Sequence, residues 1–249
     1  MPNSVDSDRY NEEWIACAWG EDNIQELLAE GELQPRPRVA RALELCDLKP
    51  GLAMLDIACG RGEVPAIAAE KGLFSVGIDY SFTILDMANQ VRSKRSDAHA
   101  GQFDMSIVQT DACTLPFQAD SFDRITMLDI VEHLTPGQLR LMFAEVKRLL
   151  KPGGYAVVHT LPNRWVYDIG YKWFRHINHK LPTQPRSEIE QQVHINEQDI
   201  VGLSNMLGQC GLHREVWLEQ FIPAQARWQS SKKGLSDNRG TMYPMLAGG

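Results

Sequence analysis

The sequence predicts an α/β protein built on a doubly wound, mostly parallel seven-stranded sheet with a helical cap. Two patterns lead to this fold class: short apolar runs alternate with helix-spaced stretches, and a glycine-rich turn joins the first run to its helix. Strands that are buried on both faces read as nearly continuous apolar runs, and their alternation with helices indicates parallel crossovers. The expected strands of this alternation are 53–58, 74–79, 105–110, 122–129 and 155–160.

The expected helices end or begin at recognisable signals. Gly72 closes the first helix after the glycine turn, and Thr135 with Gln138 forms a capping box ahead of the last one. Asn196 stands where a helix cap is expected further on. The helices expected on these grounds are 21–31, 39–48, 62–71, 81–92, 135–150 and 196–210, followed by a strand at 215–222 and a final edge strand at 241–246.

Composition narrows the class of protein. The chain has 249 residues, of which 43% are apolar and 23% charged, so it is long enough to bury a full core in one domain. Its net charge of −7 disfavours a non-specific nucleic-acid binder, because a phosphate backbone would be repelled. The five scattered cysteines suit a reducing compartment, and no signal-like or membrane-length apolar run is present. We therefore expect a cytoplasmic protein without a membrane span.

The segment from Leu55 to Glu63 carries the strongest functional signal. A strand runs into a turn containing Gly60 and Gly62, and a helix follows. Glycines let the backbone approach a ligand, and the helix N-terminus offers free N–H groups to an anion. Asp79 ends the next strand, 19 residues after Gly60, where a carboxylate can accept hydrogen bonds from ribose hydroxyls.

A dinucleotide-binding site would show the same strand, glycine turn, helix and following acidic residue. A lone glycine motif is therefore a weak signal. Three features separate the two interpretations. Pro65 stands where the third dinucleotide glycine is needed, Asp56 is placed to meet an amino group, and Asp111 with Ala112 follows the third strand. One such aspartate would be explained as a strand-end cap, whereas acidic residues at three successive strand ends favour a nucleoside-type ligand.

The motifs, taken as an ordered set, resemble class I S-adenosylmethionine (SAM) dependent methyltransferases, and especially the ubiquinone-pathway O-methyltransferases. The resemblance rests on DIACGRGE, VGIDYS, TDACTLPFQADSFD, LDIVEHL and LLKPGG. It implies a final antiparallel strand pair and SAM as the cofactor. It also implies a set of cofactor-binding residues, in which the ribose would lie on Asp79, the adenine against Tyr80 and its amine near Asp111. The implied set is Asp56, Ala58, Gly60, Arg61, Gly62, Asp79, Tyr80, Asp111, Ala112 and Leu128.

Two segments outside the alternation are candidates for the acceptor site. Residues 1–35 are expected to form an N-terminal helical lid on a methyltransferase domain at 36–249, and residues 161–195 a cap insert. The insert is aromatic and locally basic in an acidic chain, which suits an anionic or aromatic small molecule. An amphipathic helix with its basic side in water explains the charges equally well. The candidate acceptor residues are Trp14, Asn163, Arg164, Tyr167 and Tyr171.

A second cluster of candidates follows the fourth strand. Glu132 and His133 lie three and four residues after Asp129, so a helical turn would place all three side chains on one side. His194 precedes the helix expected at 196, and we expect it to fold back over the same crevice. These four side chains are the predicted ligands of a divalent metal, Mg²⁺, Mn²⁺, Fe²⁺ or Zn²⁺, which would activate an acceptor hydroxyl. A metal-free alternative makes His133 or His194 a general base, with Glu132 beside them, and a structural role stays open.

The sequence thus predicts a SAM-dependent methyltransferase that acts on a small molecule, at a hydroxyl oxygen. Three alternatives remain at this stage. They are an RNA 2′-O-methyltransferase that uses the basic insert, a SAM-binding protein without catalysis, and an NAD(P) oxidoreductase.

Overall fold

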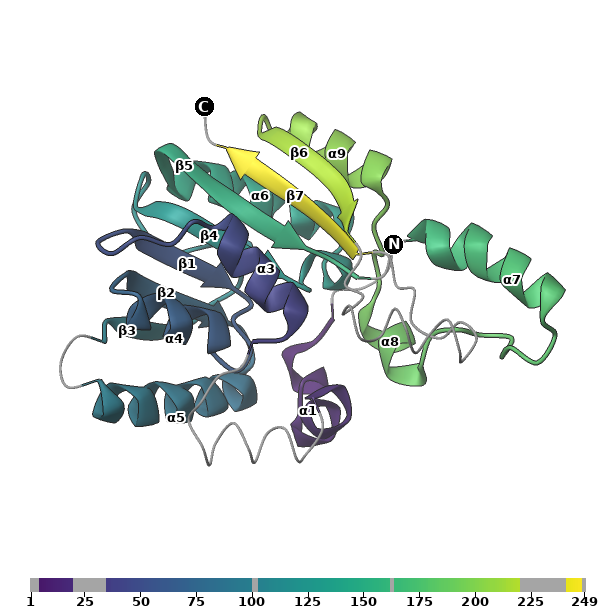
Figure 1. The fold of residues 1–249 in the computed structure, drawn as a ribbon, viewed down its shortest axis with the longest axis horizontal. Coiled ribbons are helices and arrows are strands. Elements are labelled where there is room, and N and C mark those ends of the chain that lie inside the picture. Colours follow the sequence, from purple (N-terminus) through teal and green to yellow (C-terminus); the bar gives the residue numbers. More distant parts are fainter. Residues whose placement is uncertain (1–4, 20–34, 100–102, 162–163, 220–240, 248–249) are drawn as a thin grey trace.

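The computed structural model describes residues 5–19, 35–99, 103–161, 164–219 and 241–247. Its centre is a sheet in the strand order β3-β2-β1-β4-β5-β7-β6 (Figure 1). The strands are β1 (Ala53–Ile57), β2 (Phe74–Asp79), β3 (Met105–Gln109), β4 (Phe122–Leu128), β5 (Leu150–His159), β6 (His213–Glu219) and β7 (Thr241–Ala247). The first five pair in parallel, and the predicted doubly wound, mostly parallel sheet is confirmed.

The C-terminal strand pair differs in place from the prediction. The final strand, expected at an edge, lies inside the sheet, because β7 pairs antiparallel with both β5 and β6. The edge strand on that side is β6. The sequence pattern gives a strand's existence but not its neighbours, which depend on long-range pairing.

Helices cover both faces of the sheet. The helices are α1 (Glu12–Trp19), α3 (Pro37–Leu45), α4 (Glu63–Glu70), α5 (Phe82–Ala98), α6 (Pro136–Leu149), α7 (Lys172–Ile177), α8 (Glu188–Val193) and α9 (Ile200–Gln209). Helices α6 and α9 pack on one face through Leu139, Phe143 and Leu203, whereas α3 and α4 pack on the other through Leu43 and Val64. None of the described helices combines the length and the apolar character needed to cross a bilayer.

Helix boundaries follow local capping chemistry. The expected capping box is present at α6, where Thr135 and Gln138 bond to each other's backbone. At α9 the expected cap was wrong: Asp199, not Asn196, accepts a hydrogen bond from the Gly202 N–H, and the helix starts at Ile200. The Asn196 N–H instead donates to the carbonyl of Glu132, which holds this loop against the site described below. The helix expected at 21–31 lies outside the described residues.

The N-terminal segment packs against the carboxyl side of the sheet. The short 3₁₀ helix η1 (Ser7–Arg9) and α1 bring Tyr10 and Ile15 against Ile84 and Met87 of α5 and Val193 of α8. Figure 1 shows α1 below α3, between α5 and α8. Two segments far apart in sequence, near residues 10 and 193, therefore lie side by side at one end of the molecule.

Candidate active site

A cavity of about 920 Å³ opens at the carboxyl edge of the parallel strands. The ends of β1, β2 and β4 and the loops after them supply its floor, and the N-terminal segment and α8 supply its far wall. This is the crevice in which open α/β sheets bind their ligands. Its volume lies near the upper end of small-molecule sites, so it has room for a cofactor and an acceptor together.

Asp79 organises the glycine loop at one end of the cavity. Its carboxylate accepts hydrogen bonds from the Gly60 N–H at 3.3 Å and the Ser81 N–H at 3.0 Å. Gly60 has a φ of +54°, a conformation that favours glycine. Burial raises the pKa of Asp79 to about 6, although these backbone hydrogen bonds act in the opposite direction. The carboxylate thus fixes the loop while one side still faces the cavity.

Asp56 lies deeper on the floor of the cavity. The Thr126 hydroxyl of the neighbouring strand donates to its carboxylate at 2.6 Å. Burial, with smaller contributions from Asp79 and Glu63, raises the pKa of Asp56 to about 7. A cationic group placed beside these carboxylates would relieve that cost, because an opposite charge favours the ionised form.

The predicted cofactor residues gather here with one exception. Asp56, Ala58, Gly60, Arg61, Asp79, Tyr80, Asp111, Ala112 and Leu128 all line the cavity. Gly62 does not: it caps α4 with a φ of +79°, and a Cβ there would meet Met105 and Ala88 at 3.1 and 3.2 Å. Its role is close packing of the loop on α5 and β3, which the glycine spacing alone did not distinguish from ligand contact.

The other end of the cavity holds two histidines and a glutamate. Glu132 and His133 lie on the 3₁₀ turn η2 (Val131–His133), and His194 follows α8. The His133 and His194 ring centroids are 5.0 Å apart. Ligand atoms of all three residues lie within 4.8 Å of one another. The expectation that His194 folds back over this crevice agrees with the structure.

Hydrogen bonds hold this cluster from two sides. Glu132 accepts from the Thr160 hydroxyl at 2.8 Å and from the Leu161 N–H at 3.4 Å. The Tyr10 hydroxyl lies 2.7 Å from His133 Nδ1. Tyr10 also packs edge-on against Tyr80, with ring centroids 5.6 Å apart. One tyrosine of the N-terminal segment therefore bridges the glycine-loop end of the cavity and the histidine end.

Burial disfavours the charged forms of all three side chains. It lowers the pKa of His133 to about 3, with a further contribution from His194, so the imidazole is neutral at physiological pH. Burial also lowers the pKa of His194. The pKa of Glu132 is raised well above its usual range by burial and by the negative charge of Asp129. Neutral imidazoles have a free lone pair, which is the form required of a base or a metal ligand.

Asp129, the fourth predicted metal ligand, lies apart from these donors. It forms a hydrogen bond with His159 Nδ1 and an ion pair of 2.9 Å with Arg38. Its backbone has a φ of +60°, in the left-handed region. The i, i+3, i+4 spacing predicted a shared face, but a helical turn begins only at Val131, after Asp129.

Most of the predicted acceptor residues of the insert lie away from the cavity. Arg164 forms ion pairs with Asp168 and Asp199, Tyr167 is buried beneath Arg186, and Tyr171 donates to the Pro182 carbonyl. None of these three residues lines the cavity. Trp14, the candidate from the N-terminal segment, does line it. Asn163 lies outside the described residues. The insert reaches the cavity through Leu161 and through the segment around α8, namely Ser187, Glu190, Val193 and His194.

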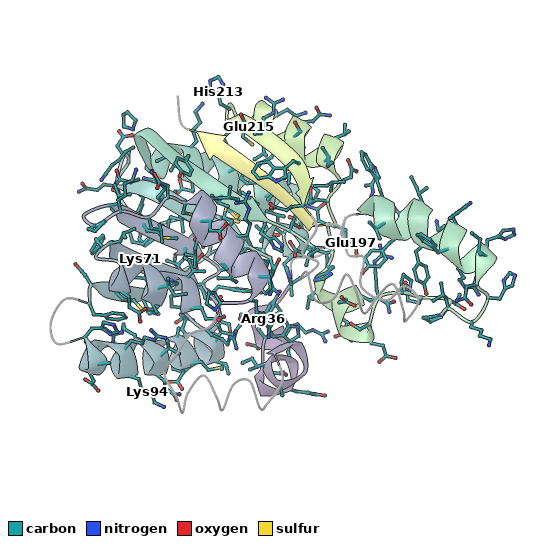
Figure 2. All side chains as sticks on the ribbon, viewed as in Figure 1. Arg36, Lys71, Lys94, Glu197, His213 and Glu215 are labelled. Carbon is teal, nitrogen blue, oxygen red and sulfur yellow. The ribbon has the colours of Figure 1, made fainter. Side chains whose placement is uncertain are left out.

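The sequence interpretation missed several cavity residues. Arg36 and Arg38 come from the segment just before the first strand, where no motif points to them. Figure 2 shows Arg36 at the start of α3, between that helix and α1. Burial and the positive charges of Arg38 and Arg61 lower the pKa of Arg36, whereas the carboxylates of Glu63 and Asp129 act in the opposite direction. Pro37 is the one available signal, because it starts a helix whose first residues face the crevice.

Comparison with known proteins agrees with this geometry. Residues 55–158 match the family described as "Methyltransferase domain". An uncharacterized methyltransferase from Synechocystis is 32% identical over half of this chain, which spans 55% of that protein. The demethylmenaquinone methyltransferase of Desulfitobacterium hafniense is 26% identical over 69% of the chain and 70% of its own length. This chain therefore spans only about half the length of the first of these relatives.

A solved structure shows the same fold. Phosphoethanolamine N-methyltransferase 2 of Haemonchus contortus, in complex with SAM, aligns with a TM-score of 0.63 at 18% identity, over 100% of this chain and 61% of that one. The ordered motifs, the parallel sheet and the family match together define the class of protein. Residues 55–158 of the chain are a methyltransferase domain, and the sheet around them has the fold of a SAM-bound methyltransferase.

Proposed function

We propose that the protein transfers the methyl group of SAM to a small-molecule acceptor, at a hydroxyl oxygen. The observation that carries this proposal is the shared cavity, which has the glycine loop and Asp79 at one end and His133 and His194 at the other. The family match supports the methyltransferase activity. Two relatives are named for small-molecule acceptors, demethylmenaquinone and botryococcene, and support that acceptor class.

In the proposed reaction, His133 accepts the proton of the acceptor. The acceptor oxygen attacks the sulfonium methyl carbon in line, the carbon–sulfur bond breaks, and its electron pair goes to sulfur to give S-adenosylhomocysteine. The hydroxyl proton passes to His133 Nε2, which requires that Nδ1 carry the proton donated to Tyr10 Oη. Burial keeps His133 in the neutral form that can accept it. The enzyme's larger contribution is positioning of the two ligands and exclusion of water.

The test is calorimetric titration with S-adenosylhomocysteine and with NAD, followed by activity assays against hydroxylated acceptors. We expect S-adenosylhomocysteine to bind and NAD not to bind. His133→Ala should lower kcat by about 10²–10⁴-fold, the usual contribution of a general base, with little change in cofactor affinity. NAD binding alone would support an oxidoreductase, and cofactor binding without turnover on any acceptor would support a binding protein.

A metal-assisted version of the same reaction is the second candidate. Among the described residues His194 Nδ1 is buried and has no hydrogen-bond partner, and ligand atoms of Glu132 and His133 lie within 4.8 Å. Two imidazoles and one carboxylate suit a divalent transition metal with open positions. Such an ion would lower the pKa of a bound hydroxyl. Within this chain, Glu132, His133 and His194 would hold the ion, His194 through Nδ1.

Chelation distinguishes the two versions. Activity that EDTA abolishes and that one added metal restores would support the metal-assisted reaction, together with metal found in protein purified without chelator. Activity unchanged by EDTA would leave His133 as a metal-free base.

A filter-binding assay tests the RNA alternative. Strong retention of RNA by the protein that falls steeply with salt would favour an RNA acceptor.

A further inference from the structure

A helical arm projects from the body of the protein and takes no part in the cavity. We define the arm as residues 164–181. It consists of the π-helical segment η3 (Val166–Tyr171), α7 and the turn that follows. Figure 1 shows α7 extending away from the sheet, to the right of the view, with the chain returning beneath it to α8.

One side of the arm contacts residues 182–186, where the chain runs back toward α8. The Tyr171 hydroxyl donates to the Pro182 carbonyl at 2.8 Å, and Arg175 donates to the Thr183 hydroxyl at 3.2 Å. The guanidinium of Arg186 lies over the Tyr167 ring at 4.2 Å. These contacts support the helix along one face and leave the opposite face outward.

The outward face carries an apolar stripe. Ile169, Trp173 and Ile177 recur every four residues and are 66%, 61% and 63% exposed. Phe174, packed edge-on against Trp173, is 44% exposed. Large apolar side chains gathered on one exposed helix face, unlike single ones scattered over a surface, mark an interaction site.

The same arm is basic within an acidic protein. Residues 164–181 include four Lys or Arg residues against one Asp, whereas the net charge of the whole chain is −7. Lys172, His176, His179 and Lys180 are exposed beside the apolar stripe. An arm with this distribution would turn toward a negatively charged surface and hold the acidic body away from it.

We propose that the arm docks on an anionic phospholipid membrane, with Trp173 and Ile177 inserted into the headgroup region. A helix with Trp, Phe and Ile on one face and Lys or Arg beside them is typical of interfacial membrane binding. A bilayer surface accepts protruding side chains without a matching hollow, which a protein partner would have to supply. Exposed isoleucines would gain nothing from RNA, whose binding depends on phosphate contacts and stacking.

The first test is co-sedimentation with vesicles, using three proteins that should all bind S-adenosylhomocysteine alike. The double variant Trp173→Ser/Ile177→Ser removes the stripe, and Lys172→Glu/Lys180→Glu reverses the charge. Leu141→Ser is the matched control, because Leu141 is 56% exposed on α6, in the body of the protein. We expect wild type and L141S to sediment with vesicles of phosphatidylcholine mixed with phosphatidylglycerol, and far less with phosphatidylcholine alone.

Each arm double variant should lose about tenfold or more in vesicle partitioning at an ionic strength of about 0.15 M. Wild-type protein that does not sediment with anionic vesicles, or arm variants that sediment as wild type does, would overturn the proposal. A wild-type dimer that the arm variants convert to monomer without any lipid, or RNA retention that depends on the arm, would also overturn it. Because cofactor affinity is measured separately, failure here is distinguishable from failure of the methyltransferase proposal.

A second measurement tests insertion at one residue. Brominated acyl chains quench tryptophans that enter the bilayer, so they should quench part of the wild-type fluorescence. In Trp173→Phe that part should disappear while sedimentation remains. Equal quenching in Trp173→Phe and wild type would show that Trp173 does not enter the bilayer and would overturn the proposed geometry.

Discussion

Asp79 combines two tasks that depend on one carboxylate. It holds the Gly60 and Ser81 amides, and it faces the space where ribose hydroxyls would lie. We expect Asp79→Ala to weaken S-adenosylhomocysteine binding by about tenfold to a hundredfold, because hydrogen bonds to a charged group contribute about 1.5–3 kcal/mol. Calorimetry measures this directly. Asp86→Ala is the control, since Asp86 contacts only Gln90 of the same helix among the hydrogen bonds of the described chain; equal losses in both variants would contradict the assignment.

The raised pKa values of the buried aspartates predict how cofactor affinity depends on pH. Burial raises the pKa of Asp56 to about 7 and that of Asp79 to about 6. The amino group of the cofactor is cationic and prefers ionised carboxylates. Affinity for S-adenosylhomocysteine should therefore rise as pH increases from about 5 to 8 and level off above the higher pKa. Asp56→Asn should flatten the upper part of the curve, and a pH-independent wild-type affinity would contradict the prediction.

Tyr10 is expected to set the protonation pattern of His133. Its hydroxyl lies 2.7 Å from His133 Nδ1, so it can accept the Nδ1 proton and leave Nε2 free to act as a base. Tyr10→Phe should lower kcat by about tenfold or more while KM for SAM stays within about twofold. Trp14→Phe, a change in the same segment, is the comparison. A loss confined to KM for SAM would indicate that Tyr10 only packs against Tyr80.

The N-cap of α9 is Asp199 and not the predicted Asn196. Asp199 accepts from the Gly202 N–H at 2.8 Å. Asp199→Ala should lower the free energy of unfolding by about 1 kcal/mol, whereas Asp199→Ser should retain most of it, because serine also caps helices. Urea unfolding measures both. Equal losses would point to the ion pair between Arg164 and Asp199 instead of the cap.

Two segments far apart in sequence, the N-terminal one and the one around α8, are positioned to close over the ligands. Residues of the N-terminal segment and of α8 line the cavity, but the arm does not. We propose that residues 5–19 and 187–194 gain hydrogen-exchange protection when S-adenosylhomocysteine binds, whereas residues 172–180 do not. The arm is thus an internal control. Equal protection of all three segments with and without ligand would count against a lid.

Much of the site could be predicted because it is local in sequence. Asp56, Gly60 and Asp79 stand at fixed positions after consecutive strands, and parallel strands bring their carboxyl ends to one edge. His133 followed from the same rule applied to the fourth strand. The alternation of apolar runs and helical periods gave the sheet for the same reason: each strand and its crossover helix form one local unit.

The remaining features depend on contacts between distant segments. The sequence did not indicate that Tyr10 would form a hydrogen bond with His133, 123 residues away. Nor did it indicate that Asp129 would pair with Arg38 and His159. Nor did the basic, aromatic composition of the insert distinguish a cap from an arm that points outward. Composition and periodicity determined the fold class and the cofactor edge of this protein. Tertiary packing decided which side chains share the cavity, because burial, hydrogen bonding and proton affinity depend on neighbours that spacing along the chain does not specify.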